Sequence, residues 1–130
     1  IQTGYHHLDK SDVFYLAALE TIGGNMTFAT GRPGTPQSIG MPALTAVGGN
    51  LFVGPTSTIA LLKPNTAITS LDFGKLTSVN SVTVDNLKSL KDFSGFTALV
   101  PYIDATRWNV TECAYNPKYS DLKNGDFTEP

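Results

Sequence analysis

The stretch TAVGGNLFVG, residues 45–54, combines a glycine pair, an asparagine and a short apolar run. A nearly identical stretch, ETIGGNMTFA, occupies residues 20–29. A glycine-rich loop that follows a strand can cradle a phosphate group, and a glycine turn can also form the corner of a structural repeat. These two interpretations lead to different functions, and the rest of the sequence decides between them.

The repetition extends beyond these two stretches. LETIGGNMTFA begins at Leu19, LTAVGGNLFVG at Leu44 and LTSVNSVTVD at Leu76, so the starts are 25 and 32 residues apart. A last copy is expected at LVPYIDA, 99–105, with Ile103 in the strand position. These spacings are typical of the coils of a short solenoid. A second alignment, of 70–79 with 89–99, matches Leu71, Phe73, Leu76 and Val79 with Leu90, Phe93, Phe96 and Leu99.

Each copy contains a short alternating segment. Leu51 and Val53 alternate with Phe52, and period 2 places the two aliphatic residues on one face of a strand. Met26 and Phe28 alternate in the same way, as do Val82 and Val84. Because one such strand cannot bury its apolar face alone, we expect stacked parallel strands that share a core. The Leu and the Ile or Val before each turn belong to a second set of short strands or corners.

The two ends follow another pattern. SDVFYLAALETI predicts a helix over 11–22 with Ser11 as N-cap. NPKYSDLKNG predicts a helix over 117–124, with Asn116 as N-cap, Pro117 in the first turn and Gly125 as the stop. The sequence therefore predicts one mainly β domain over 1–130. Its parts are an N-terminal helical cap (11–22), three to four coils (23–107) and a C-terminal cap and tail (108–130).

The pattern LxxIGGNLxV resembles the leucine-rich-repeat-like L domain of receptor ectodomains and of surface proteins of gut Bacteroidetes. ITSLDFGKLTSVNSVTV (68–84) and LTAVGGNLFV (44–53) carry the resemblance, and the tail WNVTECAYNPKYSDLKNG (108–125) is similar to the ending of such bacterial proteins. The resemblance covers roughly 19–105, or up to 125 with the tail. It implies a short right-handed solenoid, secretion or surface display, and protein or carbohydrate recognition. It implies no catalytic residues.

Composition narrows the class of partner. The 130 residues carry a formal net charge of −2 without a basic stripe, so we expect no nucleic-acid partner. No apolar run approaches the roughly 20 residues of a membrane span. The lone Cys113 allows no intrachain disulfide and no cysteine metal cluster, and it is expected to pack under the C-terminal cap. Since the chain starts at Ile1, we interpret it as a piece of a larger surface protein.

The glycine phrases match neither phosphate-binding fingerprint, because they precede strands and lack the required spacing. They are interpreted as tight corners, where glycine permits positive φ. His6 and His7 are adjacent, and no spacing supplies a third metal ligand. We therefore expect no catalytic residue, no cofactor and no metal ion. Asn25 and Asn109 stand in glycosylation sequons, which mean nothing in a bacterial protein.

Two kinds of side chain are candidates for ligand binding. Asp85 and Asp104 are expected to point outward from neighbouring strands, and paired carboxylates can cleave glycosides. Phe52 points outward at a position where the other copies have Thr27 and Thr83, and a lone outward aromatic can stack on a sugar or anchor a partner. The alternative is that the proline-containing loop 54–67 folds over Phe52. For Asp85 and Asp104, as for Asp72 and Asp92, the alternative is a solvated residue at a turn or at a strand edge.

The sequence thus favours a non-catalytic surface or secreted adhesion module that binds protein or carbohydrate, located outside the cell or in a bacterial periplasm. Its candidate ligand-binding residues are Phe52, Thr83, Asp85 and Asp104. The alternative is a carbohydrate-active or carbohydrate-binding parallel β-coil domain. A carbohydrate site requires two carboxylates, or an aromatic and a carboxylate, on one open sheet face. A protein-binding module instead presents a broad polar face without a deep pocket.

Overall fold

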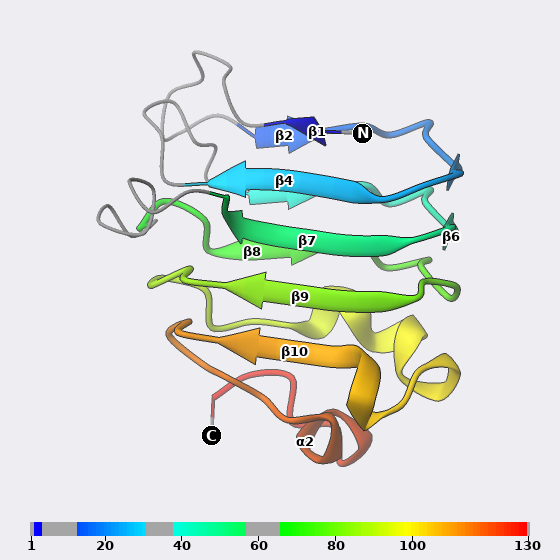
Figure 1. Cartoon of the computed structure of the whole chain (residues 1–130). Coiled ribbons are helices and arrows are strands. Elements are labelled where there is room, and N and C mark those ends of the chain that lie inside the picture. Colours follow the sequence, from blue (N-terminus) through cyan, green and yellow to red (C-terminus); the bar gives the residue numbers. More distant parts are fainter. Residues whose placement is uncertain (1, 4–12, 31–37, 57–65, 130) are drawn as a thin grey trace.

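The computed structural model describes residues 2–3, 13–30, 38–56 and 66–129. Within these ranges the chain is mainly β (Figure 1). The strands are β1 (Gln2–Thr3), β2 (Val13–Tyr15), β3 (Thr21–Ile22), β4 (Met26–Thr30), β5 (Ser38–Gly40), β6 (Ala46–Val47), β7 (Asn50–Pro55), β8 (Ser70–Asp72), β9 (Ser81–Asp85) and β10 (Trp108–Thr111). The helical segments are the 3-10 turns η1 (Ser94–Tyr102) and η2 (Ala105–Arg107) and the α-helix α2 (Tyr119–Lys123).

The strands form three sheets in which every pairing is parallel. Sheet A has the order β1-β4-β7-β9-β10, sheet B the order β2-β5-β8 and sheet C the order β3-β6. In each sheet the spatial order follows the order along the chain, because a strand of sheet A is followed by elements of the other sheets before the chain returns (Figure 1). The predicted repeat is visible in the register, since Met26 pairs with Leu51 and Leu51 with Val82.

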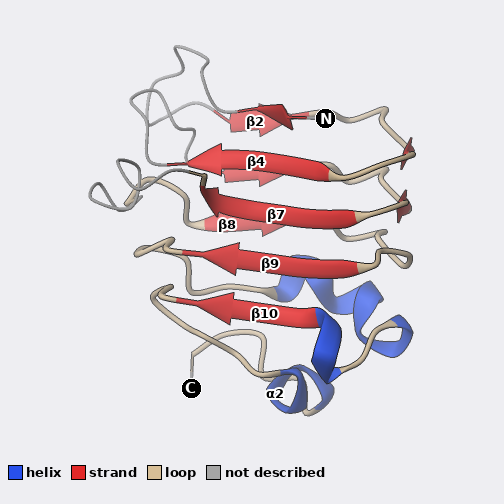
Figure 2. Ribbon diagram, viewed as in Figure 1, coloured by secondary structure: helices blue, strands red, loops and turns tan. Residues whose placement is uncertain are grey.

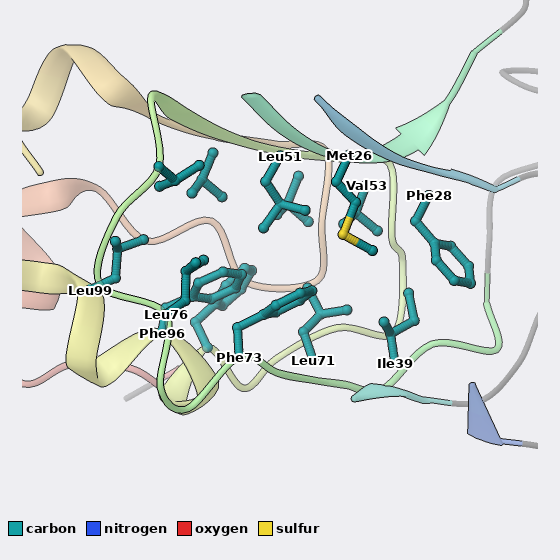
Figure 3. Packing of buried hydrophobic residues seen from close by; sticks show 14 of the residues in the cluster. Met26, Phe28, Ile39, Leu51, Val53, Leu71, Phe73, Leu76, Phe96 and Leu99 are labelled. Atoms are coloured by element: carbon teal, nitrogen blue, oxygen red, sulfur yellow. The ribbon is translucent and has the colours of Figure 1, made fainter. Parts of the chain in front are cut away.

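The core lies between sheets A and B. The inward residues of β4, β7 and β9 are fully or almost fully buried, as the alternation predicted: Met26, Phe28, Leu51, Val53, Val82 and Val84. Figure 3 shows Leu51 and Val53 pointing toward Leu71 and Phe73 from the opposite side of the molecule. Burying a Leu or Val side chain contributes about 1.5–3 kcal/mol, so short strands become stable only as a stack.

The repeated glycine pairs lie directly on one another. The Gly48 N–H donates to Ile22 C=O (2.8 Å) and the Gly49 N–H to Gly24 C=O (3.0 Å). A Cβ added to Gly48 would lie 2.2 Å from the Gly23 carbonyl oxygen. Positive φ is not the reason for these glycines, because among the described glycines only Gly125 has it (φ +83). The corner needs glycine because two backbones approach closely there.

The asparagine after each glycine pair connects one corner to the next. The backbone N–H of Asn50 donates to Asn25 Oδ1 (2.8 Å). The side-chain amide of Asn80 donates in turn to Asn50 Oδ1 (2.7 Å), and the Ser81 hydroxyl donates to the same atom (2.8 Å). The repetition in GGN is therefore a stacking requirement, because each corner hydrogen-bonds to the corner before it.

The helix predicted over 11–22 is wrong for the described part of that range. Residues Val13–Tyr15 form β2 and Thr21–Ile22 form β3. The ladder continues past β2, since the Leu16 N–H donates to Gly40 C=O (3.0 Å). An isolated helix of this length is marginal in water, so parallel pairing with β5 and β6 outweighs the local preference for helix.

The last strand of the repeat was also predicted at the wrong place. Ile103 is buried, but it follows η1 and does not belong to a strand. The strand that pairs with β9 is β10, which the sequence had assigned to the C-terminal cap. Pro101 within η1 and Asp104 before η2 favour tight turns over an extended strand. The next strand of sheet A therefore begins only after these turns. The region of stacked parallel strands therefore reaches Thr111 and does not end at 107.

The second alignment is offset in space. Ser70 pairs with Asp92, which places Leu71 opposite Phe93 and not opposite Leu90. Accordingly Phe73 stacks on Phe96, with ring centroids 5.3 Å apart. The predicted apolar residues of both stretches are nevertheless buried, because a shift along the chain leaves them on the core side of the turn.

The C-terminal helix is confirmed, but it begins at Tyr119 and its N-cap is Lys118. Asn116 does not cap it, because its side-chain oxygen accepts from the Cys113 N–H (2.8 Å). Gly125 ends the helix with positive φ, as its position suggested. Figure 2 shows η1, η2 and α2 gathered at one end of the sheets, where they cover the core beneath β9 and β10.

Candidate functional site

One row of side chains crosses the outer face of sheet A. The pairings Thr27 with Phe52, Phe52 with Thr83 and Thr83 with Asn109 place these four residues side by side on β4, β7, β9 and β10. The neighbours of each in sequence point into the core, so the row itself faces outward. Thr27, Phe52 and Thr83 are partly buried and Asn109 is exposed. The sequence predicted the first three positions and missed Asn109.

Phe52 is the aromatic member of this row. Its ring extends along its own strand to Gly54, because a Cβ added to Gly54 would lie 3.2 Å from the Phe52 Cζ atom. Glycine at 54 therefore makes room for the ring at the sheet surface. The alternative that the loop 54–67 covers Phe52 concerns mainly residues 57–65, which lie outside the described residues.

Asp85 approaches the same glycine from the next strand. The Asp85 Cβ atom would lie 3.2 Å from a Cβ at Gly54, the same distance as the Phe52 ring. An aromatic ring and a carboxylate thus flank one glycine on one sheet face. The Asp85 carboxylate is held in place, since its Oδ1 accepts from the Thr111 hydroxyl (2.9 Å) of the paired residue on β10.

Asp104 does not join this site. The expectation that Asp85 and Asp104 sit on neighbouring strands is wrong, because the neighbour of Asp85 is Thr111. Asp104 precedes η2, which leads into the start of β10, whereas Thr111 is the last residue of β10, about 10 Å further along the strand. Its carboxylate caps η2 by accepting from the Thr106 N–H (3.0 Å), and the Thr106 hydroxyl lowers the pKa of Asp104. Asp104 is a structural capping residue in this arrangement.

A second aromatic–glycine–carboxylate group lies on sheet B. Tyr15 pairs with Gly40, and Gly40 with Asp72. A Cβ at Gly40 would lie 2.8 Å from Tyr15 Cδ2 and 3.8 Å from Asp72 Cβ, so the glycine again lies between the two side chains. Tyr15 is 56% exposed. This group was not predicted from the sequence, because Tyr15 fell within the predicted helix.

Two further aspartates, Asp92 and Asp72, close turns. Asp92 Oδ1 accepts from the Ser94 N–H (2.8 Å) at the start of η1, and Asp72 Oδ1 accepts from the Gly74 N–H (3.1 Å). These are Asx turns of the kind expected for solvated turn residues. No group of three or more His, Cys, Asp or Glu side chains that could hold a metal ion occurs in the described ranges. His6 and His7 lie outside those ranges.

Cys113 packs under the C-terminal segment. It is buried, and burial raises the pKa of its thiol, which disfavours the thiolate that a nucleophile requires. Its Sγ lies 3.5 Å from the Thr111 carbonyl oxygen and 3.9 Å from that of Val84. The expected packing role of Cys113 is thus consistent with its surroundings.

No helix in the described ranges combines the length and the apolar composition that crossing a membrane requires. Comparison of the chain with models of protein families, with curated proteins and with solved structures finds no match. The functional argument therefore depends on the arrangement of the chain's own residues, above all on the outer face of sheet A.

Proposed function

We propose that the chain is a non-catalytic interaction module that binds carbohydrate on the outer face of sheet A. The observation that carries this proposal is the placement of the Phe52 ring and the Asp85 carboxylate on either side of Gly54. Aromatic rings stack on the apolar faces of sugar rings, and carboxylates accept hydrogen bonds from sugar hydroxyls. The row of Thr27, Thr83 and Asn109 supplies further hydroxyl and amide groups beside them.

The position of Asp104, the carboxylate that the sequence paired with Asp85, argues for binding rather than cleavage. Glycoside hydrolysis uses two carboxyl groups about 5–9.5 Å apart across the scissile bond. Asp104, the partner that the sequence suggested, caps η2 beyond the opposite end of β10. Asp85 itself accepts a hydrogen bond from Thr111, an arrangement that suits a fixed acceptor for a ligand hydroxyl.

The architecture proposed for this module is a short right-handed solenoid of the L-domain type. Three features support it: all sheet pairings are parallel, the strand order follows the chain, and glycine–asparagine corners stack on one another. Such a domain is proposed to act outside the cell or in a bacterial periplasm, as part of a larger surface protein. A protein ligand on the same face is the second candidate, favoured by the mostly polar row.

A glycan array tests the proposal directly. The wild-type chain is compared with Phe52→Ala and Asp85→Asn, and Lys75→Ala serves as a matched control because Lys75 is exposed and away from this face. We expect binding to at least one glycan class, loss of about tenfold or more in affinity with Phe52→Ala, and no change with Lys75→Ala. Absence of any glycan binding by the wild-type chain would reject the carbohydrate assignment and leave protein as the ligand.

A further inference from the structure

Strand β10 ends sheet A, and only one of its two edges is paired. Its partner is β9, with Trp108 opposite Val82 and Thr111 opposite Asp85. In the part of the chain that the structure describes, no strand lies on the other side of β10. An unpaired edge presents backbone N–H and C=O groups that can accept a further strand.

The direction of these groups follows from the ladder. The Asn86 N–H donates to Thr111 C=O (3.0 Å), so the backbone groups of Thr111 face β9. Because successive residues of a strand turn their backbone groups to opposite sides, the N–H and C=O of Val110 point away from β9. Outside the strand ladders, no backbone hydrogen bond joins them to another described residue. They form a free donor and acceptor pair at the edge of the sheet.

A cavity runs beside this edge. It has a volume of about 620 Å³, and β10 and the segment that leads into α2 line it. Figure 1 shows α2 beneath β10, so the two elements form opposite walls. The walls are fixed to each other, since the Trp108 indole N–H donates to Pro117 C=O (3.0 Å) in the interior. The space beside Val110 is therefore a built feature of the end of the molecule.

The charge of this cavity has one sign. Lys118 and Lys123 line it, and no acidic side chain does. The neighbouring Asp121 is turned to the backbone, where its Oδ2 accepts from the Lys118 N–H (2.8 Å). Neither lysine forms an ion pair with another described residue, and Lys123 Nζ lies 5.7 Å from the centroid of the Tyr119 ring. Two lysines that form no ion pair with a described residue thus line the cavity beside this strand edge.

We propose that this edge binds an extended acidic peptide segment, which adds to sheet A alongside β10. The Val110 N–H and C=O hydrogen-bond to the backbone of the segment, and alternate acidic side chains reach Lys118 and Lys123. Backbone pairing supplies affinity in this mode of recognition, and side chains on every second residue supply selectivity. The proposal goes beyond carbohydrate binding, because it uses the edge of sheet A in place of its outer face and a different class of ligand.

The probe is a capped peptide of alternating glutamate and valine. Trp108 is the single tryptophan and lines the cavity, so its fluorescence reports binding directly. We expect a saturable change in that fluorescence, together with a shift of the Val110 amide resonance in NMR spectra. A peptide in which lysine replaces glutamate is expected to bind at least about tenfold more weakly. Equal binding of the two peptides, or no binding of the acidic one, would overturn the proposal.

Two changes separate backbone pairing from charge. The same acidic peptide with N-methylated amides at alternate positions leaves the protein unaltered, and it should lose about tenfold or more in affinity when the methyl groups face β10. Val110→Pro removes the free N–H without removing a bond to β9, so a folded variant should lose binding to a similar extent. Unchanged affinity in the N-methyl series would overturn strand addition, whether or not Val110→Pro folds.

The charge variant is Lys118→Glu with Lys123→Glu, and its matched control is Lys75→Glu with Lys91→Glu, two exposed lysines outside the cavity. The first pair should reverse the preference in favour of the lysine–valine peptide, and the control pair should keep the preference for glutamate. Association of two copies through β10 is the competing outcome. Concentration-dependent dimers that the acidic peptide does not dissociate would contradict the proposal.

Discussion

At the scale of single residues, the repeated stretch that first suggested a phosphate loop is explained by contact between glycines. Gly48 lies against the carbonyl group of Gly23 in the preceding copy of the repeat, so close that no space remains for a Cβ. Gly23 occupies the same place in the preceding copy, yet a Cβ there would meet no atom within 4 Å. The two positions have the same sequence context and different physical demands.

This difference gives a matched pair of variants. Gly48→Ala should lower the free energy of unfolding by about 1–3 kcal/mol, because the new methyl group must displace backbone. Gly23→Ala should change it by less than about 0.5 kcal/mol. Urea unfolding monitored by circular dichroism measures both. Equal destabilisation by the two variants would show that the corners do not stack as described.

The buried thiol predicts a dependence on pH. Burial raises the pKa of Cys113 above its usual value of 9.0, so the unfolded chain releases this proton first as pH rises. The stabilisation is complete below pH 9 and is lost as pH rises toward the folded-state pKa. The unfolding free energy of wild type should therefore fall more steeply above pH 9 than that of Cys113→Ala. Parallel curves for the two proteins would refute this role of burial.

At the scale of elements, local sequence predicted the inward positions well and the type of element less well. The alternation of Leu51 and Val53 around Phe52 is enough to assign β7, because period 2 has one structural meaning. The stretch at 13–22 satisfied helical spacing too, and only its pairing with distant strands decides the outcome. A single sequence does not contain that information in a local window.

Strand β10 could have been found from the same alternation. Trp108 and Val110 alternate with Asn109 and Thr111, an inward–outward pattern like that of β9. The motif Leu-x-x-Ile/Val followed by a turn, which marks the earlier copies, is missing directly before β10, so alignment by motif did not identify this strand. The site residues on this strand were missed for the same reason, whereas Phe52, Thr83 and Asp85 were correctly placed on the outer face.

One arginine links η2 to the corner before β9. The guanidinium of Arg107 donates from Nε to Asn80 C=O and from Nη2 to Val79 C=O, both at 2.6 Å. Lysine cannot reproduce this two-pronged contact. Arg107→Lys should therefore lower the midpoint of thermal unfolding, at a cost of about 1–2 kcal/mol. Lys75→Arg, a change at an exposed site, is the control, and an equal effect of the two substitutions would argue against the link.

At the scale of the whole molecule, stability depends on one hydrophobic core to which the stacked strands all contribute. Leu51 is fully buried at the centre of sheet A, whereas Thr83 on the next strand pairs with Phe52 and faces outward. The described core around position 51 is apolar, whereas position 83 is partly exposed to water.

Leu51→Asp should thus abolish cooperative unfolding, because it places an unpaired charge in the core. Thr83→Asp should shift the unfolding free energy by less than about 1 kcal/mol. Calorimetry or urea titration separates the two cases. A folded Leu51→Asp variant beside an unfolded Thr83→Asp variant would reverse the assignment of inner and outer faces.

The central claim is that Thr27, Phe52, Thr83 and Asn109 form one row across parallel strands on the outer face of sheet A. Interstrand nuclear Overhauser effects in isotopically labelled protein test it most directly. The structure predicts backbone contacts that link Phe52 to both Thr27 and Thr83, and Thr83 to Asn109, in parallel register. Contacts in antiparallel register, or a shift that pairs Phe52 with Val84, would contradict the row and the carbohydrate proposal that depends on it.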